Sequence, residues 1–195
     1  MIGLPVPLQL TMSKIFEKPP ESVKVLGEEY KINTDFRIWL EISEFLSKEI
    51  PIKDKLCFLL INAYRDKLPP DMEAAVDALI SFMNMGKSER KSKKHEKVID
   101  FKKDQNLIYA AFYQQYGISL YRQSLHWWEF MALLSALDDN TAFIKVVGYR
   151  SVDLSKIRDD KQRSYYRKMK HRYRINNEIN DSIIADALTV GGLGG

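Results

Sequence analysis

The stretch from residue 108 to 137 constrains the fold more than any other part of the chain. It is the densest apolar and aromatic run and includes two adjacent tryptophans, in LHWWEF at 125–130. On a helix that starts near Ser124, apolar residues cover two faces: Leu125, Trp128, Ala132 and Ala136, and then Trp127, Phe130, Met131 and Leu134. A helix that is apolar on nearly every side is buried between neighbours. The pattern therefore predicts the central helix of the fold, with Trp128 almost fully buried.

The residues around this run predict a mainly α fold of six or seven helices with a small N-terminal β-hairpin. A helical stripe of Leu107, Ile108, Ala111 and Phe112 comes just before it, and Gly117 suits a helix C-cap. Alternating Val23, Val25, Tyr30 and Ile32 around Gly27 indicate the hairpin.

Apolar periodicity and capping residues predict the other helices. In the first half, Asn33 or Thr34 caps a helix whose inner stripe is Phe36, Trp39, Leu40, Ser43 and Leu46. Helices over about 53–64 and 70–85 follow, the latter with Met72 facing inward. In the second half, Asn140 caps a short helix that Gly148 closes, and Asp159 caps a last helix over about 160–174.

These elements divide the chain into five segments. We expect an irregular arm over 1–21, a hairpin with three helices over 22–86, and a flexible basic loop over 87–97. A second helical half then covers 98–175, and a flexible tail covers 176–195. A length of 195 residues suits one domain or two small ones.

Composition indicates a reducing compartment and a cytoplasmic protein. A single cysteine, Cys57, excludes a disulfide framework and a cysteine-built zinc site. No apolar run approaches the roughly 18 residues that a membrane span needs. The first ten residues lack the basic region of a signal peptide and contain two prolines.

The sequence offers little for catalysis, so we expect no enzyme, no cofactor and no metal. Only His126 among the three histidines lies in an apolar segment, and with Glu129 it supplies two ligands at most, which favours a structural histidine. Cys57 lies within LCFLL and is typical of a small core residue. No phosphate-binding loop, dinucleotide fingerprint or nucleophile elbow is present.

The formal charge of +4 hides a strong segregation. Residues 156–174 carry nine lysines or arginines and a net charge of +7, and residues 87–97 carry a net +4, which leaves the remainder acidic. In the last helix, tyrosines and Met169 share one face, and the other face carries the candidate partner contacts Arg163, Arg167, Lys170 and Arg174. This pattern fits phosphate binding, a solvated helix face, or a complement to an acidic protein surface.

Five segments resemble a known family. They are YKINTDFRIW (30–39), YAAFYQQYGISL (109–120), LHWWEFMALLSAL (125–137), KVVGYRSVDLSKI (145–157) and QRSYYRKMK (162–170). Together they are similar to the bacteriophage "gene product fifteen" family of long-tailed phages and prophages of Gram-positive bacteria. The resemblance covers about residues 22–175.

The resemblance implies a role in phage tail assembly. Members of the family are usually encoded just ahead of the tape-measure gene, which is the place of a tail assembly chaperone. Such a protein would coat the helical tape-measure protein in the host cytoplasm until tail-tube subunits displace it. It has no family catalytic residue and no membrane partner, and self-association is left open. Two alternatives are nucleic-acid binding through residues 156–174 and a structural tail component that stays in the virion.

The basic loop over residues 87–97 generates a first prediction. It is highly charged and has no periodic pattern of apolar residues, so it cannot bury enough apolar surface to become ordered. We expect trypsin under native conditions to cut within this loop first, and a shortened loop to leave the free energy of unfolding nearly unchanged. Fragment masses after limited digestion check this, and a loop that resists trypsin contradicts it.

Overall fold

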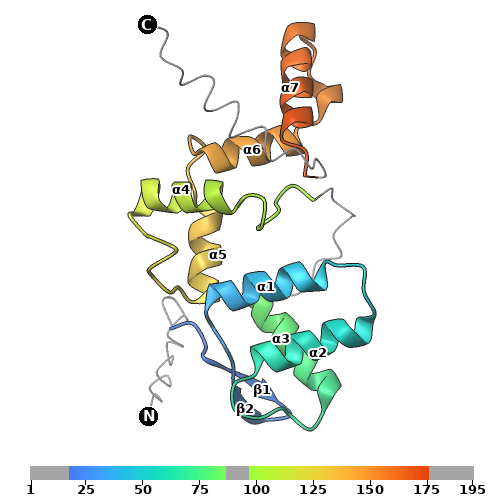
Figure 1. Ribbon diagram of the computed structural model, residues 1–195, viewed down its shortest axis with the longest axis vertical. Helices are drawn as coiled ribbons and strands as arrows, with labels where there is room; N and C mark the ends of the chain where they lie inside the picture. The colour runs from blue at the N-terminus through green and yellow to red at the C-terminus, as the bar shows by residue number, and fades with distance from the viewer. Residues whose placement is uncertain (1–17, 87–96, 176–195) are drawn as a thin grey trace, which may run out of the picture.

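The computed structural model describes residues 18–86 and 97–175, and within them the fold is mainly helical as predicted (Figure 1). The predicted tail, the predicted basic loop except Lys97, and most of the predicted N-terminal arm lie outside these residues. The hairpin and the first three helices are β1 (Ser22–Val25), β2 (Glu28–Lys31), α1 (Phe36–Leu46), α2 (Ile52–Ala63) and α3 (Met72–Met83). The second part comprises α4 (Gln105–Tyr116), α5 (Trp127–Ser135), α6 (Ala142–Ser151), the 3-10 helix η1 (Leu154–Lys156) and α7 (Asp160–Arg172).

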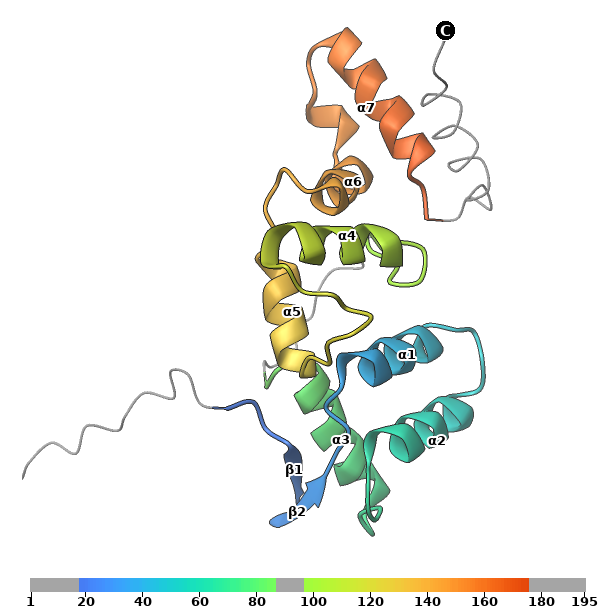
Figure 2. The ribbon, with the colours of Figure 1, turned by 60° about the vertical axis from the view of Figure 1, so that its left-hand side comes forward.

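The elements follow one another along an elongated molecule (Figures 1 and 2). The hairpin, α2 and α3 form one end, α5 stands between α1 and α4, and α6 and α7 form the other end. Among the described residues, none of the helices has the length and apolarity needed to cross a bilayer.

The β-hairpin has the register that its alternating side chains predict. Val23 pairs with Tyr30 across the two antiparallel strands. Leu26 and Gly27 both have positive φ angles, of 50° and 88°, as the two central residues of a type I′ turn require. Val25 and Tyr30 are buried, and β1 packs on α3, which gives this small sheet the support that an isolated hairpin lacks.

Aromatic side chains from four helices make the core. The fully buried Trp39 of α1 lies 4.8 Å from Phe82 of α3, between ring centroids, and its indole N–H donates to the carbonyl oxygen of Asn33 at 2.7 Å. Phe130 of α5 stacks on Phe36 of α1 at 4.6 Å and on Phe112 of α4 at 5.3 Å. These stacked rings fix α5 between α1 and α4.

The prediction that Trp128 is almost fully buried is wrong, because its neighbour Trp127 occupies the core. Trp127 is 3% exposed whereas Trp128 is half-buried, and α5 begins at Trp127 rather than near Ser124. Both indoles donate to carbonyls at the end of α3, Trp127 to Met83 at 2.9 Å and Trp128 to Phe82 at 2.8 Å. The face with Ala132 and Ala136 is exposed, so α5 is buried on one side rather than all round.

Two predicted helix-capping positions are wrong, because the backbone groups of those residues form hydrogen bonds with other residues and the helices start later. Asp35, not Asn33 or Thr34, caps α1, because the Asn33 N–H donates to Ala63 and the Thr34 carbonyl accepts from Trp127. Thr141 caps α6 in place of Asn140, whose N–H donates to the carboxylate of Asp138. Gly148 lies inside α6 and does not close it, since the helix continues to Ser151.

Two side chains predicted to be inside are exposed. Cys57 lies on the outer side of α2, because the inner stripe of Leu59, Leu60 and Ala63 places position 57 about 100° or more away from its centre. Met72 starts α3 and is exposed, whereas Ala75, Leu79 and Phe82 are the buried residues of this helix.

The contrast between the two tryptophans gives a second prediction. We expect Trp127→Ala to lower the free energy of unfolding by about 3–5 kcal/mol, because it empties a buried site and removes the bond to Met83. Trp128→Ala, at a half-exposed site, should cost about 1–2 kcal/mol. Urea unfolding of both variants measures the difference, and equal losses contradict the assigned burial.

Candidate partner-binding site

The basic helix α7 lies at the edge of the molecule. Asp159 caps it as predicted, its carboxylate accepting from the Gln162 N–H at 2.6 Å. No residue of α7 is buried, and in the described part of the chain it packs on α6 and η1. Figure 2 shows it projecting past α6, away from the core. One face of this helix is therefore half-buried against the preceding segments, and the other face is available to solvent.

Tyrosines provide one attachment of α7. Tyr149 of α6 lies 5.7 Å from the stacked ring of Tyr173 and also contacts Tyr165 and Tyr166 edge-on or tilted. The hydroxyl groups of Tyr149 and Tyr165 are 3.3 Å apart, and this hydrogen bond raises the pKa of the Tyr149 phenol. The predicted tyrosine face of α7 thus packs on a fourth tyrosine, although Tyr165 stays half exposed.

A buried ion pair provides the second attachment. Arg150 of α6 forms two hydrogen bonds with Asp104 at the start of α4, of 2.6 and 2.8 Å, with both side chains almost fully buried. The same guanidinium donates to the carbonyl oxygens of Val98, at 3.0 Å, and Tyr173, at 2.6 Å. Asp104 also accepts from the backbone N–H of Asp100 at 2.9 Å. One side chain therefore joins α4, α6, the segment before α4 and the end of α7.

The sequence prediction missed this pair because its members are 46 residues apart. Nothing in the local pattern distinguishes Arg150 from the many other arginines near the end of the chain. An alignment that showed the two positions varying together would be the signal able to identify the contact.

The four predicted contact residues divide into two groups. Arg163 donates to the carbonyl oxygens of Ile157 and Arg158 at 2.9 and 3.1 Å, and Lys170 donates to that of Val152 at 3.2 Å. These two side chains hold α7 against the segment before it. Arg167 and Arg174 line a hollow between α7 and the rest of the molecule, and Lys170 reaches the same hollow from its place against Val152.

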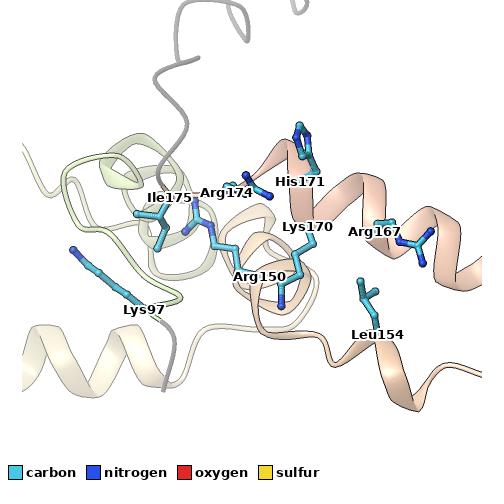
Figure 3. A pocket seen from close by; sticks show the side chains of 8 residues that line it. All are labelled: Lys97, Arg150, Leu154, Arg167, Lys170, His171, Arg174 and Ile175. Carbon is cyan, nitrogen blue, oxygen red and sulfur yellow. The ribbon is translucent and has the colours of Figure 1, made fainter. Parts of the chain in front are cut away.

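This basic hollow has a volume of about 760 Å³ and gathers cations from three parts of the chain. Figure 3 shows Lys97 at one end and Arg167 at the other, with Arg150, Arg174 and Lys170 between them. The remaining lining residues are Leu154, His171 and Ile175, so no acidic side chain among the described residues lines it. Such a set of donors is suited to holding an anion.

The described residues offer no comparable site for a cation. Within residues 18–86 and 97–175 no group of three or more histidines, cysteines or carboxylates is placed to hold a metal ion. His126 is structural, as predicted: its ring caps α5 by accepting from the Trp128 N–H at 3.0 Å, and the backbone N–H of His126 donates to the Glu129 carboxylate at 3.1 Å. Its other ring nitrogen lies 3.1 Å from the Pro20 carbonyl oxygen.

A protein-family model matches most of the chain. The family described as Bacteriophage Gp15 protein matches residues 15–175, a range that includes every helix and strand the structure describes. No curated protein and no solved structure matches the chain.

The buried pair gives a third prediction. We expect Arg150→Met to lower the free energy of unfolding by about 3–5 kcal/mol, because it leaves the Asp104 carboxylate buried and unpaired. The exposed Arg158→Met is the control and should change it by less than about 0.5 kcal/mol. Adding Asp104→Leu to Arg150→Met should recover part of the loss in urea unfolding, and strictly additive losses would contradict the pairing.

Proposed function

Because the chain belongs to the Bacteriophage Gp15 protein family, we propose that it is a tail assembly chaperone that binds the tape-measure protein transiently. The family match supports this role, since the resemblance places such proteins beside the tape-measure gene of long-tailed phages. The proposal places the protein in the cytoplasm of the bacterial host, and it includes no catalytic step, no cofactor and no membrane partner. Tail-tube protein would displace it as the tail grows.

The basic α6–α7 end of the molecule is the structural observation that supports a binding role. Residues 156–174 carry a net +7, whereas the chain outside the two basic segments is acidic. Exposed charges at the rim of an interface act mainly on encounter rate and specificity, and add little to affinity. Many moderate contacts of this kind, repeated along a long helical client, suit a protein that must later be displaced.

Nucleic-acid binding is the second candidate function, because α7 also carries exposed Lys161 and Lys168, with Arg158 just before its cap. These cations lie outside the hollow and would bind phosphates independently of it. The affinity for nucleic acid would then fall steeply as the salt concentration rises. A structural tail component is the third candidate, and self-association remains compatible with all three.

Charge reversal tests the chaperone proposal, and this is the fourth prediction. Arg167→Glu with Arg174→Glu should weaken the binding of tape-measure fragments about tenfold at low salt and less at high salt, while leaving the fold intact. Arg163 and Lys170 are left unchanged, because their bonds to carbonyl oxygens hold α7 in place. Arg158→Glu with Lys161→Glu is the matched control, with the same change in charge outside the hollow.

Two readouts separate the alternatives. Binding of tape-measure fragments by the wild type with no shift of duplex or single-stranded DNA supports the chaperone, and strong DNA binding with no fragment binding overturns it. Mass spectrometry of purified virions separates the chaperone from a tail component. The chaperone should be missing from the particle, and a tail component should be present in stoichiometric amount.

A further inference from the structure

The basic hollow has an imbalance of charge that a bound anion would correct. Arg150 is neutralised by Asp104, and Lys97 has an exposed ion pair with Asp100 at 3.3 Å. Neither Arg167 nor Arg174 has a carboxylate within ion-pair distance in the described part of the chain. An anion that enters the hollow therefore meets two guanidinium groups that no carboxylate of the described residues neutralises, and each presents a fork of N–H donors.

The walls of the hollow indicate what kind of anion fits. Leu154 and Ile175 add apolar surface beside the cations, which suits the aliphatic stem of a glutamate as well as its carboxylate. Binding of single-stranded nucleic acid draws on aromatic faces on which bases stack. Here the tyrosines of α7 pack on Tyr149 and do not line the hollow. The chemistry therefore favours the carboxylates of an acidic peptide over nucleic acid.

The position of the hollow links binding to the docking of α7. Lys97 belongs to the segment before α4, whereas Arg167 lies on α7 and Arg174 just beyond it. Since no residue of α7 is buried, its separation from α6 costs far less than unfolding of the aromatic core. A ligand that contacts both sides of the hollow binds only the docked state, so it stabilises that state.

We infer that the basic hollow is a carboxylate-binding site for acidic stretches of a helical protein client, and that filling it fastens α7 onto α6. The choice of client rests on the proposed chaperone function. Arg167, Arg174 and Lys97 bind the carboxylates, and Arg150 acts as a positioning residue. Its bonds to Asp104 and to the Tyr173 carbonyl set the width of the hollow.

Variants of the full-length protein in which three positive side chains are replaced by glutamine test this inference, with a short oligoglutamate peptide as the ligand. The pocket variant carries Lys97→Gln, Arg167→Gln and Arg174→Gln, and the control carries Arg158→Gln, Lys161→Gln and Lys168→Gln, so both lose three positive charges. Fluorescence anisotropy should show affinity weakened about tenfold or more in the pocket variant and within about twofold of wild type in the control. Circular dichroism verifies that both variants are folded.

Hydrogen exchange provides the second readout, which a general charge effect would not change. Saturating peptide should slow amide exchange over residues 160–172 in the wild type and the control, and leave it unchanged in the pocket variant. Equal weakening by the two sets of substitutions, unaltered exchange in the wild type, or preference for an oligothymidine of equal charge would each overturn the inference.

Tape-measure fragments distinguish failure of this inference from failure of the proposed function. If the pocket variant binds the fragments as well as the wild type does, the hollow is not the client site, although the chaperone role stands. If the peptide fills the hollow as expected but no fragment binds, the site stands and the tape-measure protein is not its client.

Discussion

The ion pair between Arg150 and Asp104 determines how the α6–α7 end of this molecule is joined to α4. Its bidentate bonds of 2.6 and 2.8 Å connect α6 to the start of α4, and two carbonyl bonds extend the same guanidinium to the segments at 97–104 and 173–175. Removing two charges from water is costly, and a buried pair adds little net stability compared with apolar residues. Its contribution is geometric, because it sets where α7 lies and so where the basic hollow forms.

The two ends of the molecule depend on different forces. The α1–α5 part is held by stacked rings, with Trp39 and Phe112 fully buried, so its stability comes from apolar burial and packing. The α7 end is held by tyrosine contacts, by side-chain bonds to carbonyl oxygens and by one ion pair. Local opening is therefore expected to be cheapest at α7. A helix that opens easily beside a rigid core suits the proposed chaperone, which has to release its client later.

The sequence predicted most of the helices because apolar periodicity acts locally. The stripe at Ile108, Ala111 and Phe112, the left-handed Gly117 and the hairpin turn all depend on residues a few positions apart. The failures came from contacts with distant segments. Asn33 does not cap α1, and its N–H donates to the Ala63 carbonyl oxygen. Trp127 rather than Trp128 is buried, because α5 begins at Trp127 and places its ring against Trp39 of α1.

The same distinction applies to the candidate site. Local charge pattern identified α7 and placed Arg167 and Arg174 on one side of it, and both line the hollow. The pattern had no means of showing that Arg163 and Lys170 bond to carbonyl oxygens, since only the path of the chain before α7 brings those oxygens near. Arg150 was missed for the same reason, because its partner lies in another part of the sequence.

In the proposed role, a protein client contacts this molecule at its basic end. Chemical cross-linking of the complex with the tape-measure protein, followed by mass spectrometry, locates that contact, because exposed lysines lie at both ends. We expect cross-links to the client from Lys97, Lys161 and Lys168, beside the hollow and on α7, with few from Lys24, Lys53 and Lys67 around the hairpin and α2. Cross-links concentrated at the hairpin end would contradict it.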